Sequence, residues 1–305
     1  MLNASTWKPA CKEGFVTARD GVELFYRQWR PEASDVTSVV LFIHGIGLHG
    51  SSAPYGDKVL IPELLGKGTG FYSIDLRGHG RSGGDIERIA GNTLVQDVDC
   101  HVQRIREEHG NVPVYLYGHN FGGILSLYYA SACEGSVRGV IVAEYSKRIK
   151  SSVKRIMKPN TVSALMSRTI NRIRGGSSSF RFLNPVEYER LCSRYHIPVD
   201  DRILNSLKLS RPGESKMVYG KEFFSACGAG RETQIARKVR SPVLMIFARN
   251  DPFFDVRGAY DVLTRTGSFD KTLIQVDIEG HYSVIESSKD YISRWIAKRL
   301  PGSIS

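Results

Sequence analysis

A strand-like run that ends in a glycine-flanked turn constrains the fold of this chain more than any other feature. The β-rich run Pro113–Tyr117 leads into Gly118, and a second glycine, Gly122, follows the turn residue Asn120 by two positions. Apolar residues then continue at helical spacing, so the pattern predicts a strand, a sharp turn and a helix. Glycines on both sides indicate that strand and helix approach too closely for side chains. The turn residue is expected at positive φ, which asparagine tolerates better than most residues.

The rest of the chain alternates β-rich and helical patterns. Phe15–Arg30 alternates around the turn signal Arg19-Asp20-Gly21, which predicts an opening hairpin. Strands alternating with helices predict a mostly parallel central sheet with helices on both faces, an α/β fold. The predicted strands are Ser38–Ile43, Gly70–Leu76, Pro113–Tyr117, Val137–Tyr145, Val243–Ala248 and Lys271–Ile278, and the predicted helices are Ala53–Lys67, Asn92–His109, Phe121–Cys133 and Ser287–Arg299.

The alternation stops between residues 146 and 240. This stretch contains four prolines and the run Gly175–Ser179 among short helical patterns. Such a composition indicates an inserted segment and not a continuation of the sheet. We therefore predict a core formed by residues 1–145 and 241–305, with residues 146–240 as an inserted helical cap.

Three motifs in chain order carry a resemblance to a known family. His44-Gly45-Ile46-Gly47 follows the first central strand, and Asp75–Gly84 contains the pattern D-x-R-G-H-G-x-S. The turn at Gly118–Gly122 matches the G-x-S-x-G nucleophile elbow with asparagine at the serine position. Together they resemble monoacylglycerol lipases and lysophospholipases of the serine aminopeptidase-type hydrolase family. The resemblance implies an α/β-hydrolase fold and hydrolysis of carboxylic esters with an apolar acyl group.

The resemblance also implies a catalytic site at the strand ends. Asn120 occupies the nucleophile position, Asp251 follows the strand Val243–Asn250 as the acid, and His281 follows the next strand as the histidine. This is the chain order expected for the fold. The backbone N–H groups of Ile46 and Phe121 are the implied oxyanion donors, and they do not depend on the side chain at position 120.

Other polar residues in or near the motifs have simpler expected roles. Asp255 is the alternative acid. His44, His79 and His119 are expected to hold turns by hydrogen bonds, because a catalytic base must reach the reacting proton.

Asn120 separates this chain from the pattern of the family. A carboxamide has no hydroxyl proton for a histidine to remove and no lone pair suited to attack an acyl carbon. A natural degenerate site, an inactivating change from serine or aspartate, and a chemistry without a covalent intermediate all remain open. An aspartate ancestor would be of the epoxide hydrolase or dehalogenase type, whose oxyanion turn usually carries proline where Gly47 stands. A non-catalytic ligand-binding protein is the alternative outside the enzymes.

Composition and spacing exclude several other classes. The chain has 305 residues, 41% of them apolar, which is enough for a buried core. The net charge of +11 favours anionic partners, but no zinc-finger or RNP motif is present, so nucleic acid is not expected. Gly78–Gly84 lacks dinucleotide spacing and the histidines show no H-E-x-x-H pattern, so no cofactor or metal is expected. Scattered cysteines and a polar N-terminus predict a cytoplasmic protein.

A basic segment lies within the predicted cap. Residues 147–174 contain nine Lys and Arg residues and no Asp or Glu, with apolar residues interleaved at helical spacing. One interpretation is a lid that lies on an anionic membrane surface and admits a lipid-like substrate, which would make the protein peripheral to the membrane. The other is a cap helix with its apolar side on the core and its basic side in water. Both interpretations put the segment next to the substrate pocket.

Overall fold

The computed structural model describes residues 10–32, 35–50, 59–89, 91–148, 150, 179–181, 189–190, 192–193, 199, 204 and 218–302. Its main sheet contains β1 (Cys11–Thr17), β2 (Glu23–Trp29), β3 (Ser38–Ile43), β4 (Thr69–Ile74), β5 (Val114–His119), β6 (Gly139–Ala143), β9 (Val243–Asn250) and β10 (Lys271–Glu279). A separate pair consists of β7 (Ser179–Arg181) and β8 (Val218–Gly220). The helices are α1 (Leu60–Leu65), α2 (Thr93–His109), α3 (Phe121–Ala132), α8 (Lys221–Cys227), α9 (Glu232–Lys238), α10 (Val256–Thr264), α11 (Ser283–Ser287) and α12 (Lys289–Ala297), with a 3₁₀ turn η1 (Ile86–Arg88).

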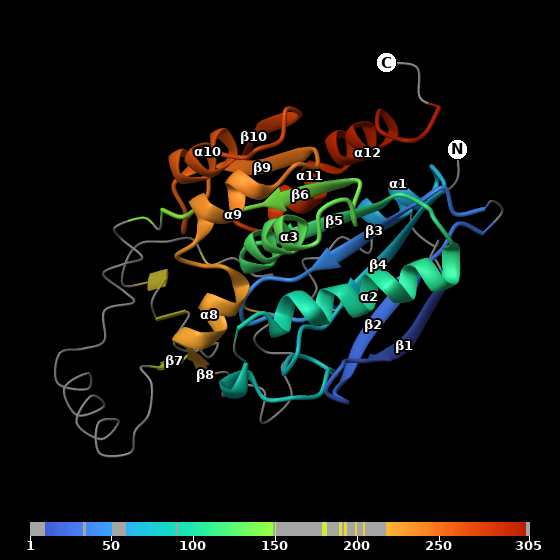
Figure 1. Ribbon diagram of the computed structural model, residues 1–305. Coiled ribbons are helices and arrows are strands. Elements are labelled where there is room, and N and C mark those ends of the chain that lie inside the picture. The colour runs from blue at the N-terminus through green and yellow to red at the C-terminus, as the bar shows by residue number, and fades with distance from the viewer. Residues whose placement is uncertain are drawn as a thin grey trace.

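The eight strands of the main sheet follow the order β1-β2-β4-β3-β5-β6-β9-β10 (Figure 1). The first two pairs, β1 with β2 and β2 with β4, are antiparallel. The other neighbours are parallel. The carboxyl ends of β3, β5, β6, β9 and β10 therefore meet at one edge of the sheet, where ligands bind in open α/β sheets.

The predicted elements agree with the observed ones where a regular spacing of apolar residues continues over a long segment. The bounds of β3 are those predicted, the opening hairpin is present as β1 and β2, and α2 begins one residue after the predicted start. The prediction of a helix over Ala53–Lys67 is only partly met. The helix α1 spans Leu60–Leu65, and residues 51–58 lie outside the described residues.

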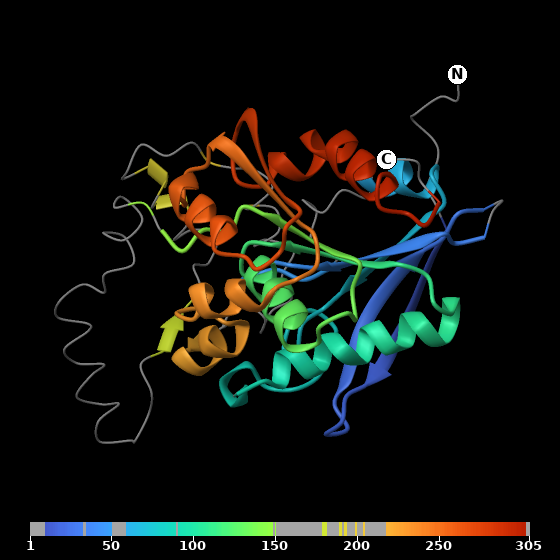
Figure 2. The ribbon, with the colours of Figure 1, turned by 45° about the horizontal axis from the view of Figure 1, so that its top comes forward.

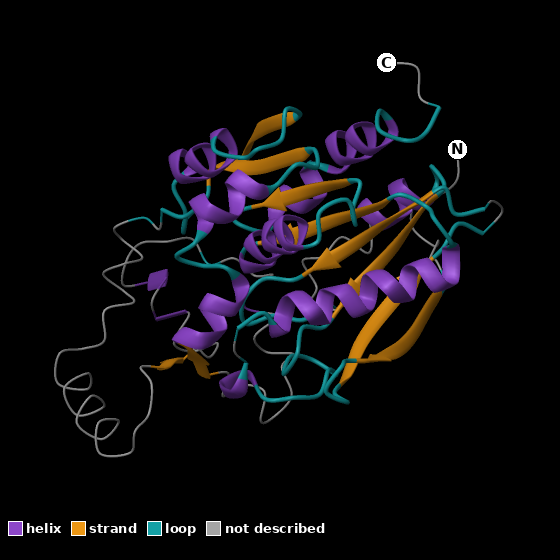
Figure 3. Cartoon of the chain, in the orientation of Figure 1, coloured by secondary structure: helices purple, strands orange, loops and turns teal. Residues whose placement is uncertain are grey.

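Side chains alternate between the two faces of the sheet. Along β3, Val39, Leu41 and Ile43 belong to one core cluster, whereas Val40 and Phe42 belong to the other. The first cluster packs under α2, α3, α8, α9 and α10, and the second under α1, α11 and α12. Figures 2 and 3 show the helices on both sides of the strands. A sheet covered on both faces is what the continuous apolar runs of its central strands predict.

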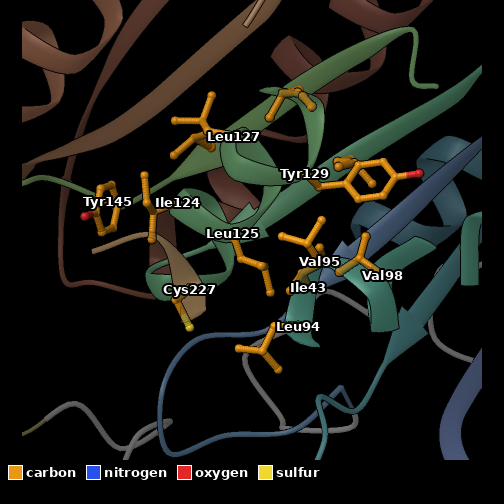
Figure 4. Close-up of a cluster of buried hydrophobic side chains, with 14 of the residues drawn as sticks. Ile43, Leu94, Val95, Val98, Ile124, Leu125, Leu127, Tyr129, Tyr145 and Cys227 are labelled. Atoms are coloured by element: carbon orange, nitrogen blue, oxygen red, sulfur yellow. The ribbon is translucent and has the colours of Figure 1, made fainter. Parts of the chain in front are cut away.

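Helix α3 packs against both the sheet and α2. Figure 4 shows Leu125 of α3 pointing toward Leu94 and Val95 of α2, whereas Leu127 points to the opposite side of α3. All four side chains are buried. A fully buried side chain of this kind contributes about 1.5–3 kcal/mol through the hydrophobic effect. This packing fixes the start of α3, and with it the turn that carries Asn120.

The division into core and cap stays a prediction, because most of residues 146–240 lie outside the described residues. Within this stretch, α8 and α9 pack against α3. Of the basic segment 147–174, the structure describes residues 147, 148 and 150. Lys147 and Arg148 pair with Asp261, and the Lys150 ammonium donates to the backbone carbonyl of Asp251. No helix in the described part of the chain is long and apolar enough to cross a bilayer.

Candidate active site

Asn120 lies in a tight turn between β5 and α3. Its φ is 54°, the positive value that the sequence predicts. A Cβ atom on Gly118 would lie 2.1 Å from the backbone oxygen of Gly122, and one on Gly122 would lie 2.2 Å from the oxygen of Ile43. Both flanking positions therefore require glycine because backbone, and not a movable side chain, occupies the space. The turn holds residue 120 at the carboxyl edge of the sheet, between β3 and β6.

The Asn120 carboxamide is bound at both of its polar atoms. Its Nδ2 lies 2.9 Å from Nε2 of His281, and its Oδ1 accepts a hydrogen bond of 2.7 Å from the backbone N–H of Phe121. If the amide were turned over, its oxygen would face Nε2 of His281, an acceptor, and its NH₂ group would face the N–H of Phe121, a donor. The orientation in the structure avoids both mismatches, because it pairs each donor with an acceptor.

Asp251 orients the imidazole ring from the other side. Its Oδ2 lies 2.5 Å from Nδ1 of His281, and both side chains are buried. The other oxygen, Oδ1, accepts hydrogen bonds from the backbone N–H groups of Phe253 and Phe254. Burial raises the pKa of Asp251, but the positive charge that His281 can carry and the hydrogen bond from His281 outweigh it, so the pKa is lowered. Asp251 is the ionised partner in this contact.

Asp255, the alternative acid, is engaged elsewhere. It caps the start of α10, where its Oδ1 accepts a hydrogen bond of 2.9 Å from the N–H of Arg257. Its carboxylate also pairs with the Arg257 guanidinium, which lowers the pKa of Asp255 to about 2. The structure thus brings Asp251, and not Asp255, to His281.

The turn that carries Ile46 lies against Asn120. A Cβ on Gly45 would lie 2.9 Å from the Cβ of Asn120, so the two turns touch directly. The second implied donor, the N–H of Phe121, is occupied by the Asn120 carboxamide. The oxyanion roles of Ile46 and Phe121 stay predictions. If they are correct, Asn120 itself blocks one of the two donors.

Two of the histidines in the motifs hold turns, as expected. His44 bonds the carbonyl of Gly45 through Nδ1 and accepts the N–H of Leu76 at Nε2. His119 lies 3.3 Å from the carbonyl oxygen of His281 and packs against its ring. Burial lowers the pKa of His44 and of His119 well below the ordinary value, so both rings are neutral.

Tyr219 of β8 is a site residue that the sequence did not reveal. Its hydroxyl accepts the N–H of Gly47 at 2.9 Å and lies 2.9 Å from Nε2 of His79. Nδ1 of His79 donates to the carbonyl of Arg77, so Nε2 must accept and the Tyr219 hydroxyl must donate to it. One hydroxyl thus links the His44–Gly47 turn to the Asp75–Gly84 turn. No local pattern could indicate a contact with a residue 172 positions away.

Replacing Tyr219 with phenylalanine should lower the free energy of unfolding by about 1–3 kcal/mol, because Gly47 N–H and His79 Nε2 lose their buried partner. Urea unfolding followed by circular dichroism measures this change. Tyr128→Phe is the matched control, since among the described residues the Tyr128 hydroxyl has only a long contact of 3.5 Å, with Arg231. Equal midpoints for the two variants would show that the Tyr219 hydroxyl does not hold the turn.

Glu144 is the second residue that sequence reasoning missed. It directly follows β6, is 0% exposed, and accepts the N–H of Ala248 at Oε1. Ligand atoms of Glu144, Asp251 and His281 lie within 4.8 Å of one another, close enough for a metal ion. The hydrogen bond between His281 Nδ1 and Asp251 Oδ2 already joins two of these three side chains. An acidic residue immediately after an apolar strand was the available signal.

Comparison with known proteins assigns the sequence to a family. The sequence profile described as serine aminopeptidase, S33 matches residues 34–287. The chain belongs to this family. This S33 chain is 27% identical to human monoglyceride lipase, over 92% of its own length and 88% of that protein.

Solved structures show that the S33 chain has the α/β-hydrolase fold. A monoacylglycerol lipase from Paleococcus ferrophilus superposes with a TM-score of 0.60 and 22% identity, covering 90% of this chain and 98% of that one. A soluble variant of monoglyceride lipase from Saccharomyces cerevisiae, in complex with a substrate analog, gives 0.68 and 16%, with 98% of both chains covered. The predicted fold class, with its mostly parallel sheet, is confirmed.

Proposed function

We propose that this site is built to hydrolyse carboxylic esters with an apolar acyl group, and that Asn120 prevents formation of an acyl-enzyme. The observation that carries the proposal is the double engagement of the carboxamide. It bonds His281, the residue that would activate a serine, and the N–H of Phe121, which would stabilise an oxyanion. His281 and Asp251 lie beside the substituted position and bond one another, which supports the proposal.

The expected chemistry follows from these contacts. With serine at position 120, His281 Nε2 would remove the hydroxyl proton and later return it to the leaving alcohol, while Asp251 would stabilise the imidazolium. Backbone N–H groups of Ile46 and Phe121 would bind the negative oxygen of the tetrahedral intermediate. With asparagine, there is no hydroxyl group to deprotonate, so no covalent bond to the substrate forms.

Aromatic side chains around the site support an apolar substrate. The rings of Phe253 and Phe254 pack on His281 at centroid distances of 5.1 and 5.7 Å, and Phe121 packs against Phe224 at 5.2 Å. The similarity to proteins named monoglyceride lipase supports glyceryl esters as the substrate class. A cytoplasmic location and contact of segment 147–174 with an anionic membrane surface stay predictions from the sequence.

A substrate panel tests this proposal. The Asn120→Ser variant should hydrolyse monoacylglycerols and p-nitrophenyl esters, with a preference for longer acyl chains, and should not act on epoxides or haloalkanes. Gain of activity on epoxides or haloalkanes by Asn120→Asp instead would favour an ancestor with an aspartate nucleophile. If neither variant acts on any substrate, but the unmodified chain binds a 1-O-alkylglycerol ether tightly in calorimetry, the site serves binding and not hydrolysis.

A further inference from the structure

Glu144 has a backbone conformation that residues other than glycine rarely adopt. Its φ is 51°, and in the described part of the chain Asn120 is the only other non-glycine residue with a positive φ. The left-handed conformation costs a residue with a side chain roughly 1–2 kcal/mol, and such residues cluster at functional sites. Here the conformation directs the carboxyl group inward, toward the Ala248 N–H and the loop that carries Asp251.

The second oxygen of Glu144, Oε2, is fully buried, and no donor among the described residues reaches it. The nearby Asp251 carboxylate can only accept when it is ionised. Ligand atoms of Glu144 and Asp251 lie within 4.8 Å of each other. If both carboxyl groups were ionised they would repel, and burial would destabilise both charges. A proton on one of them removes the repulsion and supplies the missing donor.

The hydrogen bonds indicate which carboxyl carries that proton. Asp251 accepts three N–H groups, from His281, Phe253 and Phe254, whereas Glu144 accepts one, from Ala248. Hydrogen bonds to the ionised form favour that form. Asp251 is therefore the carboxylate and Glu144 the carboxylic acid.

The charged and titratable groups around Glu144 agree with this assignment. Burial, followed by the charge of Asp251, raises the pKa of Glu144 well above its ordinary value, and the nearby Lys150 ammonium only partly offsets this. Tyr117 of β5 is neutral, because burial raises its pKa. His281 donates its Nδ1 proton to Asp251 and does not bond Glu144.

We propose that Glu144 is a positioning residue that works as a neutral carboxylic acid: its Oε2–H donates to the Asp251 carboxylate, and the two groups share one negative charge. The result is a continuous series of hydrogen bonds. Phe121 donates to Asn120, Asn120 donates to His281, and both His281 and Glu144 donate to Asp251. The catalytic part of this inference rests on the proposed hydrolytic function. In that reaction Glu144 would make Asp251 less basic and hold it in place, so that the proton stays on His281.

The protonation state can be tested on the chain as it is, by comparison with Glu144→Gln. Glutamine keeps an acceptor for Ala248 and a donor for Asp251 but cannot ionise. The unfolded chain releases the Glu144 proton near pH 4.3, whereas the folded protein keeps it to higher pH. The stability that this proton gives is thus complete below the ordinary pKa and is lost as pH rises toward the raised folded pKa.

Urea unfolding of the unmodified protein and of Glu144→Gln is measured between about pH 5 and 8. Asp251 titrates in both proteins, so its effect cancels when their unfolding equilibrium constants are compared. The unfolding equilibrium constant of the unmodified protein, divided by that of Glu144→Gln, should rise about tenfold per pH unit over at least part of this range. A ratio independent of pH would overturn the proposal. An increase of melting temperature with Zn²⁺ that disappears in Glu144→Gln would also overturn it, since a cation and not a proton would then join the three groups.

Activity in the Asn120→Ser background tests the positioning role. Glu144→Leu should lower kcat by about 10- to 100-fold with little change in KM, a loss like that seen when outer partners that orient histidines in metal sites are removed. Glu144→Gln, which keeps the donor to Asp251, should restore most of this loss. Equal losses for the two variants would overturn the role of a neutral donor. If Asn120→Ser hydrolyses no ester, the proposed function fails, while the pH-dependent unfolding still decides the state of Glu144.

Discussion

Replacing Asn120 with serine should raise the rate of ester hydrolysis by several orders of magnitude, up to about a million-fold, the loss known when a triad serine is removed. Two changes act together. The serine hydroxyl would stand near Nε2 of His281, where the carboxamide nitrogen now lies 2.9 Å away, and the N–H of Phe121 would be released from Oδ1. Hydrolysis of p-nitrophenyl butyrate by the purified variant and by the unmodified chain measures the gain.

Two control variants separate the effects at position 120. Asn120→Ala frees the Phe121 N–H but supplies no nucleophile, so it should stay at the background rate. Adding His281→Ala to Asn120→Ser should return the rate to that background, because the serine then has no base. If the unmodified chain hydrolyses esters as fast as the serine variant, and His281→Ala abolishes this, a mechanism without a nucleophile at residue 120 must replace the proposal.

Alanine at Gly118 or Gly122 should lower the free energy of unfolding by at least about 3 kcal/mol, the upper end of ordinary overpacking. The added Cβ would lie 2.1 Å from the backbone of Gly122 in the first variant and 2.2 Å from the backbone of Ile43 in the second. Because these neighbours are backbone atoms, β5, α3 and β3 would have to move apart. Urea unfolding midpoints and the yield of folded protein measure the loss.

Gly70→Ala provides the matched control for both glycine variants. Gly70 also lies in a buried strand of the sheet, β4, but a Cβ there would meet its nearest atom at 3.4 Å, an ordinary contact. Its effect should therefore be small. If Gly118→Ala is as stable as Gly70→Ala, the elbow has room for a side chain and the close approach of strand and helix is not what demands glycine.

Much of the fold could be predicted because its signals are local. The apolar run Val39–Ile43 and the helical spacing of Leu94, Val95 and Val98 are visible in short windows of sequence. The order of the motifs then indicated which strand ends carry Asn120, Asp251 and His281, and the structure brings these three side chains into one series of hydrogen bonds.

The parts of the site that sequence reasoning missed depend on contacts between distant segments. Tyr219 lies in a stretch without strand and helix alternation and reaches Gly47 of the His44–Gly47 turn only through tertiary packing. Glu144 sits one residue beyond an apolar run, where its burial and its distance from Asp251 follow from the pairing of β6 with β9. Neither the burial of the Glu144 carboxyl group nor its protonation state can be inferred from the composition or from the spacing of apolar residues.

The pairing of β6 with β9 has a consequence for how this chain can vary in evolution. Val140 pairs with Val243, although about one third of the sequence, residues 144–242, separates the two strands. Once such a long connection is closed, doubling its length costs only about 0.6 kcal/mol of further closure entropy. Insertions, deletions and new sequences between these strands are therefore inexpensive, provided that core contacts such as that of Tyr219 are kept. The predicted cap can therefore change its sequence and length while the strand ends that carry the polar groups stay as they are.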